Sequence, residues 1–163
     1  MLTGWKSSQW QKVRETHGVF TLSVVLKSHV DGFEWAITNV RQYMWNEFRG
    51  FSQSISGAWV VAGDFNVIRF AHERCGRRAH YQDTAEFRGV IRELELMDIP
   101  LNGRKYTWSN MRGSMAKLDR FLLSLEWDSK FPMPIQKGLA SQLFDHCPVL
   151  LGNGTWFEMT SIF

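Results

Sequence analysis

The run "AWVVAGDFN", residues 58–66, constrains the fold more than any other part of the sequence. Its apolar residues are consecutive rather than alternating, which is typical of a strand buried on both faces. Asp64 and Asn66 stand two positions apart at its end, so a continued strand would point both side chains the same way. The run therefore predicts a central strand that presents a carboxylate and an amide at one end. An Asx turn that closes the strand is the alternative, because Asp and Asn are common turn residues.

Along the rest of the chain, segments whose apolar residues alternate as in a strand are followed by segments with the apolar spacing of a helix. This order predicts a mixed α/β domain. Asp31-Gly32 predicts a hairpin turn between the first two strands. Asp83 is the expected N-cap of the second helix, because Glu86 follows three residues later. The expected strands are 19–27, 33–40, 106–109, 117–124 and 147–151. The expected helices are 42–56 and 83–98, with a short amphipathic segment at 125–131.

The composition supports one folded domain. Of the 163 residues, 44% are hydrophobic and 14% are aromatic, which is enough to build a packed core. The cysteines Cys75 and Cys147 lack ligand spacing, so we expect reduced thiols in an intracellular protein. The sequence has neither the apolar core of a signal peptide nor an apolar run of about 18 residues, so we expect no secretion and no membrane span.

Positive charge is concentrated in one part of the chain. The net charge is +3, and residues 69–120 contain 11 Lys and Arg against 7 Asp and Glu. That segment carries +4, which leaves −1 for the remainder. The distribution permits a polyanionic partner, and ordinary surface charge explains it equally well.

Polar residues at two more predicted strand ends indicate a reactive site. Asp119 stands within an apolar strand, and Asp145-His146 directly precedes the last strand. A carboxylate beside a histidine favours the protonated imidazole, which can donate to an anionic reaction centre. We therefore expect Asp119 to pair with His146 close to Asp64, whose carboxylate can orient or deprotonate a water. The structural alternatives are a cap at Asp145-His146 and a salt bridge from Asp119 to Lys117 or Arg120.

Three ordered segments resemble the endonuclease/exonuclease/phosphatase superfamily, most closely the endonuclease domains of plant non-LTR (LINE-type) retrotransposons. They are "WVVAGDFNVIRFAHERCG", "YTWSN" followed by "KLDRFLLS", and "DHCPVLL". The resemblance spans 19–151, so 1–18 is expected to be a non-matching N-terminal segment and 152–163 a C-terminal tail. It implies an α/β fold, a two-sheet sandwich flanked by helices, that is incomplete at the N-terminus.

The resemblance also implies residue roles in a metal-dependent phosphodiester hydrolase that nicks DNA. Asp64 would activate the attacking water, and Asn66 would contact the phosphate. His146, paired with Asp119, would stabilise the charge that develops on the phosphate. Asp145 would assist metal or water placement, and Mg²⁺ (or Mn²⁺) would be held weakly by Asp145 and Asp64.

Several positions depart from the family pattern. The metal-binding Glu and the strand with an active-site Asn have no counterpart before Val19, and Tyr43 does not match the motif of the active-site Tyr. Phe144 stands where the family often has Ser. We therefore expect impaired hydrolysis. Missing N-terminal strands would also expose a hydrophobic strand edge or face, which favours self-association.

Basic residues flank the candidate site and predict contacts with the DNA backbone. Thr107 in "YTWSN" matches a position of the family's substrate pocket. The expected nucleic-acid-binding residues are Arg69, Arg74, Arg77, Arg78, Arg104, Lys105, Thr107, Arg112 and Lys117. Action on DNA would imply a nuclear location. Two other functions stay open: a catalytically inactive, nucleic-acid-binding retroelement remnant, and a small-molecule or inositol-phosphate phosphatase.

Overall fold

The computed structural model describes residues 5–40, 45–76, 81–140, 145–153 and 158–161. Its helices are α1 (Trp45–Ser54), α2 (Tyr81–Glu93) and α3 (Leu125–Lys130). Its longer strands are β1 (Trp10–His17), β2 (Thr21–Ser28), β3 (Glu34–Val40), β4 (Ala58–Asp64), β10 (Asp119–Leu123), β11 (Pro134–Gly138), β12 (Val149–Asn153) and β13 (Glu158–Ser161). Its two-residue strands are β5 (Arg74–Cys75), β6 (Met97–Asp98), β7 (Leu101–Asn102), β8 (Trp108–Ser109) and β9 (Met115–Ala116). None of the described helices is long and apolar enough to cross a membrane.

A six-stranded sheet forms the centre of the molecule, in the order β1-β2-β3-β4-β10-β6. Strands β3 and β4 run parallel, and the other neighbouring pairs are antiparallel. Strand β4 is covered on both faces, because one buried cluster packs it against β12 and another packs it against α1 and α2. Val60 and Ala62 belong to the core on one side, and Trp59 and Val61 belong to the core on the other. This position explains why the apolar residues of β4 are consecutive in the sequence.

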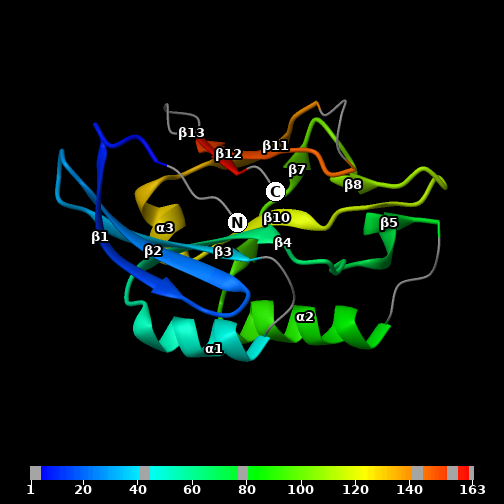
Figure 1. Cartoon of the computed structure of the whole chain (residues 1–163), viewed down its shortest axis with the longest axis horizontal. Helices are drawn as coiled ribbons and strands as arrows, with labels where there is room; N and C mark the ends of the chain where they lie inside the picture. Colours follow the sequence, from blue (N-terminus) through cyan, green and yellow to red (C-terminus); the bar gives the residue numbers. More distant parts are fainter. Residues whose placement is uncertain (1–4, 41–44, 77–80, 141–144, 154–157, 162–163) are drawn as a thin grey trace.

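A second sheet, β13-β12-β11-β7, packs on one face of the central sheet. Figure 1 shows β11, β12 and β13 above the central sheet, with α1 and α2 along its opposite face. Val149 and Leu151 of β12 pack with residues of β2, β3, β4 and β10 in one buried cluster, which also contains Trp127 of α3. The protein is therefore a two-sheet sandwich with α1 and α2 on its outside.

Aromatic side chains fill the layer between the central sheet and the two long helices. Phe65, directly after β4, lies 5.1 Å from Phe87 of α2 between ring centroids. The ring of Phe87 also stacks on Trp45 of α1 at 5.1 Å. Phe65 and Phe87 are fully buried. These contacts fix the end of β4, and with it the backbone on both sides of Asp64.

The predicted mixed α/β sandwich is confirmed, with differences in detail. The strands β2, β3, β4, β10 and β12 and the helices α1 and α2 overlap the expected segments, and the 125–131 segment contains α3. Because α2 begins at Tyr81, Asp83 lies in its first turn and the expected N-cap is wrong. The helix ends at Glu93, so Met97 belongs to β6 rather than to the expected helix 83–98. The strands β11 and β13 were not predicted, since "PIQKG" and "EMTS" lack a clear apolar alternation.

Strand β1 belongs to the segment 1–18 that the family resemblance leaves out. It pairs antiparallel with β2 and forms one edge of the central sheet. Its residues from Gln11 to His17 are exposed, and most of them are polar or charged. Such residues are typical of a protected sheet edge. The self-association expected from an exposed hydrophobic edge stays a prediction.

Candidate active site

The candidate site lies where β4 ends and β10 begins. These two strands are antiparallel, and Asp64 and Asp119 are direct partners in their register. Gly63 lets β3 approach closely at this point, because a Cβ there would lie only 2.0 Å from the carbonyl oxygen of Val40. Its φ of 152° lies in a range that non-glycine residues rarely adopt. The sheet therefore places two carboxylates side by side at one end.

His146 completes the cluster and is held by Asp119. Its Nδ1 lies 2.9 Å from Oδ2 and 3.1 Å from Oδ1 of Asp119, which is fully buried. Its Nε2 lies 3.9 Å from Oδ2 of Asp64. The hydrogen bond to Asp119 raises the pKa of His146 against the opposing effect of burial, and the negative charges of Asp119, Asp64 and Asp145 add to the increase. The imidazole is thus oriented by one carboxylate and directed toward the other.

Asp64 combines a turn with a partly exposed carboxylate. Its Oδ1 accepts a hydrogen bond from the backbone N–H of Asn66 at 2.8 Å, so the Asx turn considered from the sequence is present. Asn66 adopts a left-handed φ of 52° and is exposed. Burial and the neighbouring Asp119 carboxylate raise the pKa of Asp64. The turn therefore leaves Oδ2 of Asp64 facing His146.

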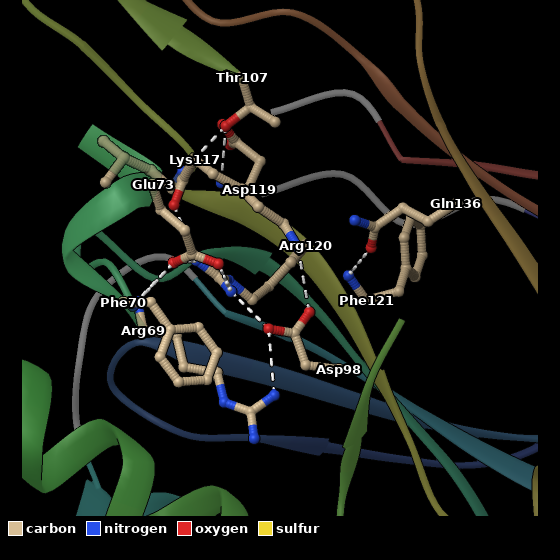
Figure 2. A network of polar contacts seen from close by, with 11 residues as sticks. Arg69, Phe70, Glu73, Asp98, Thr107, Lys117, Asp119, Arg120, Phe121 and Gln136 are labelled. Carbon is tan, nitrogen blue, oxygen red and sulfur yellow. Dashed lines mark hydrogen bonds and ion pairs between the residues drawn. The ribbon is translucent and has the colours of Figure 1, made fainter. Parts of the chain in front are cut away.

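Thr107 connects the two chain segments that carry Asp119 and His146. Its Oγ1 accepts hydrogen bonds from the backbone N–H groups of Leu118 (2.9 Å) and Asp119 (3.0 Å), as Figure 2 shows for Asp119. Its carbonyl oxygen accepts the backbone N–H of Cys147 at 2.8 Å. The threonine is fully buried. The expectation of a Thr107 contact with nucleic acid is therefore corrected, because the hydroxyl is engaged inside the protein.

A hollow of about 370 Å³ adjoins His146 on the side of β8. Asp145 is exposed there, and its Oδ2 accepts a hydrogen bond from the indole Nε1 of Trp108 at 3.3 Å. Arg104 and Lys105 also line the hollow and are exposed. The hollow thus brings His146 and Asp145 together with two surface cations.

The other basic residues that were expected to bind nucleic acid differ in their exposure to solvent. Arg112 is exposed and Arg74 is partly buried, whereas Arg77 and Arg78 lie outside the described residues. Lys117 is buried with its Nζ 3.2 Å from Oδ1 of Asp98, so the expected contact of Lys117 with nucleic acid is also corrected. Arg69 is partly exposed, with Nη1 3.5 Å from Oδ2 of Asp98. Tyr43 and Phe144, noted as departures from the family, also lie outside the described residues.

A buried group of charges beside the site was not found by sequence reasoning. Arg120 is fully buried and pairs with Glu73 and Asp98, not with Asp119. Arg120 stands within an apolar strand, and this position indicates a buried guanidinium. Such a group requires carboxylate partners. The sequence alone does not say which carboxylates these are.

The donors of the cluster fit a loosely held divalent cation. Ligand atoms of Asp64, Asp119 and His146 lie within 4.8 Å of one another. Asp119 is fully buried and bonded to His146, so Asp64 is the carboxylate of this group that an ion can reach. Asp145 is exposed and adds negative charge near Asp64, but it is not part of the group. Mg²⁺ often binds to one or two carboxylates together with water and substrate phosphate. Burial raises the pKa of Asp64, and the negative charges of Asp119 and Asp145 add to the increase. A cation bound here would offset these charges.

The layered architecture is the fold of endonuclease/exonuclease/phosphatase proteins. Solved structures with this fold include a family member from Bacteroides thetaiotaomicron, with 13% identity and a TM-score of 0.58 over 90% of this chain and 66% of that one. Another is the endonuclease domain of TRAS1, a telomere-specific non-LTR retrotransposon, with 12% identity and a TM-score of 0.60 over 81% and 63%. A third is a mannosyl-6-phosphatase from Bacteroides thetaiotaomicron, with 14% identity and a TM-score of 0.59 over 91% and 68%.

The likeness to these structures concerns the fold alone. The chain spans less than two thirds of the length of the first two. No protein-family model matches the sequence, and no curated protein matches it. What the chain does must therefore be argued from its own residues.

Proposed function

We propose that the chain carries a phosphodiester-hydrolysing centre that acts on DNA. The observation that carries the proposal is the cluster at the ends of β4 and β10. It holds a histidine between a buried carboxylate and a partly exposed one, with Nδ1 at 2.9 Å from Asp119 and Nε2 at 3.9 Å from Asp64. A carboxylate base facing a charged donor is the arrangement that attack of water on a phosphate requires.

Each member of the cluster has a distinct role in this proposal. Asp119 fixes the orientation of the imidazole and keeps the proton on Nδ1. The protonated His146 donates from Nε2 to a phosphate oxygen and stabilises the negative charge that develops there. Asp64 accepts a proton from the attacking water, and its raised pKa makes it a stronger base than an ordinary aspartate. Asn66, exposed at the same strand end, donates its side-chain amide to the phosphate.

A divalent cation, Mg²⁺ or Mn²⁺, would be held by the carboxylates of Asp64 and Asp145. When bound, it supplies positive charge that neutralises phosphate oxygens. Two carboxylates are few ligands for an ion that prefers six oxygen ligands, so we expect weak metal binding and slow hydrolysis.

DNA is supported as the substrate by the cations of the adjoining hollow. Arg104 and Lys105 are exposed and line the same hollow as His146. Cations next to a hydrolytic site bind the phosphates that flank the scissile one, and they do so without reading sequence. A phosphomonoester of a small molecule would need fewer such contacts. A DNA substrate implies a nuclear location.

A catalytically inactive, nucleic-acid-binding protein is the second candidate function. It is favoured by the hydrogen bond of Asp145, whose Oδ2 accepts the indole N–H of Trp108. That bond leaves fewer free oxygens for a metal ion. The basic hollow would still bind a polyanion.

The test is nicking of supercoiled plasmid by purified protein with Mg²⁺ or Mn²⁺, beside an EDTA control and the variant His146→Ala. We expect metal-dependent nicking that His146→Ala lowers by about 10²- to 10⁴-fold. The matched control is His29→Ala, which removes an exposed histidine from the turn between β2 and β3. Nicking that survives His146→Ala would refute the proposal.

Absence of nicking by a sample with a cooperative unfolding transition would favour the inactive alternative. The affinity for a short DNA duplex, measured by fluorescence anisotropy at several salt concentrations, then decides whether that alternative holds. Binding through phosphate contacts weakens as salt rises, with a slope of roughly −0.9 per neutralised phosphate. The variant Arg104→Ala/Lys105→Ala should reduce that slope.

A further inference from the structure

A cluster of buried charges lies directly beside the candidate site, on the other face of β10 from Asp119. The fully buried guanidinium of Arg120 makes two parallel contacts to Glu73, at 3.2 Å from Nη1 to Oε1 and 3.0 Å from Nη2 to Oε2. Nη1 also lies 2.6 Å from Oδ2 of Asp98. Figure 2 shows this network between the loop after β4, the start of β10 and β6. The arrangement is bidentate and almost entirely shielded from water.

Burial makes this network costly, so its presence requires an explanation. Taking charges out of water costs several kcal/mol for each ion, and apolar residues of similar volume often stabilise a protein as well as a buried ion pair does. What an ion pair adds is a defined geometry, since the planar guanidinium accepts few orientations of its partners. The network therefore suits a place where the backbone must be held in one position.

One end of the network holds the loop that follows β4. Oε2 of Glu73 accepts hydrogen bonds from the backbone N–H groups of Arg69 (2.6 Å) and Phe70 (3.2 Å). The same carboxylate thus closes the loop on itself and attaches it to Arg120. Phe65, at the start of this loop, donates its N–H to the carbonyl oxygen of Leu118 at 3.1 Å. The loop is therefore joined to the β10 side at two points.

The other end holds the backbone just before Asp119. Nη2 of Arg120 donates to the carbonyl oxygen of Lys117 at 2.8 Å, and the N–H of Lys117 donates to the carbonyl oxygen of Glu73 at 2.9 Å. The next two N–H groups, of Leu118 and Asp119, are bonded to Thr107. The approach to Asp119 is thus fixed by Glu73 and Arg120 on one side and by Thr107 on the other.

We propose that Glu73 and Arg120 are positioning residues, whose buried ion pair holds the 117–119 backbone so that Asp119 meets His146 in the geometry required for catalysis. The consequence for catalysis rests on the function proposed above, whereas the backbone restraint does not. Neither side chain touches the reacting atoms. Their effect is transmitted through the carbonyl and amide groups of Lys117.

The test is the double variant Glu73→Gln/Arg120→Met, which removes one charge of each sign. Asp98 keeps Lys117 and Arg69 as partners, at 3.2 Å and 3.5 Å. Each single variant should lower the unfolding temperature by more than the double variant does, because a single change leaves an uncompensated buried charge. The matched control is Arg49→Met/Glu93→Gln, which removes an exposed Arg–Glu pair between α1 and α2 at 2.9 Å.

The decisive readouts are hydrogen exchange of individual backbone amides and the kinetics of plasmid nicking. In the double variant, the amides of residues 117–119 should exchange faster, while the amide of Leu122 in the middle of β10 stays protected. The turnover number kcat should fall by about 10- to 100-fold with little change in KM, since misplacement of a catalytic group affects the chemical step. Neither readout should change in the control variant.

Wild-type exchange at residues 117–119 in the double variant would overturn the proposal, because the ion pair would then only stabilise the fold. A wild-type protein that nicks no DNA would refute the proposed hydrolysis alone, since the exchange measurement needs no activity. If the double variant does not fold, Arg120→Lys replaces it. That variant keeps the charge but cannot reach Glu73, Asp98 and the Lys117 carbonyl together, so the same faster exchange is expected.

Discussion

Replacing Thr107 by valine tests how the site is held together. The hydroxyl accepts two buried backbone N–H groups, those of Leu118 and Asp119, and valine has the same shape without an acceptor. A buried donor left without a partner costs about 1–3 kcal/mol, so two of them cost roughly 2–6 kcal/mol. The added methyl group returns about 0.8 kcal/mol. We therefore expect Thr107→Val to lower the free energy of unfolding by about 1–5 kcal/mol.

The control is Thr107→Ser, which keeps the acceptor and loses one methyl group. That change should cost only about 1 kcal/mol. The assay is urea unfolding followed by tryptophan fluorescence, with the slope of each transition compared to confirm that the unfolding reaction is the same. If Thr107→Val were no more destabilising than Thr107→Ser, water or another group would be satisfying the two N–H groups, and the reasoning would be refuted.

Two further predictions concern the titratable groups. Asp119→Asn should lower the pKa of His146 toward its ordinary value, because the substitution removes the carboxylate whose hydrogen bond raises that pKa. A pH titration of the histidine ring signals by NMR measures the pKa. An unchanged pKa would contradict the role given to Asp119. Since the folded-state pKa of His146 is raised, the stability from this pair is fully present below the pKa of the unfolded state and is lost as pH rises through the folded-state pKa. Asp64→Asn should raise the free energy of unfolding at neutral pH, because burial and Asp119 disfavour the charged form of Asp64 while an asparagine can still accept the N–H of Asn66. That gain should vanish as pH falls below the unfolded-state pKa of aspartate, and urea unfolding at pH 7 and at low pH would show whether it does.

The sequence predicted the fold best where local spacing decides the structure. The strands β2 and β3 follow from period-two alternation, and β4 follows from a consecutive apolar run that ends in turn residues. Prediction failed at β11 and β13, whose residues pair in a sheet although they do not alternate clearly. It also failed at Asp83, where a good capping pattern stands inside the first turn of α2. In these cases packing against the rest of the chain outweighs the local preference.

The candidate site was predicted in part. Asp64, Asp119 and His146 were expected at strand ends, and the structure brings their side chains together. Thr107 and Lys117 were expected to contact nucleic acid and are buried, because each is bonded to partners that are distant in the sequence. The sequence shows the residue types of a site but not which of them face solvent.

The amino-acid sequence by itself determined the buried central strand, its polar end and the mixed α/β class. These depend on apolar periodicity and turn chemistry, which are local properties of the chain. Only the tertiary structure decided that Asp119 bonds to His146 and that Arg120 bonds to Glu73, 47 residues away. Adjacent residues on a strand face opposite sides of the sheet, so the partners of Asp119 and Arg120 depend on which segments the fold packs against each face.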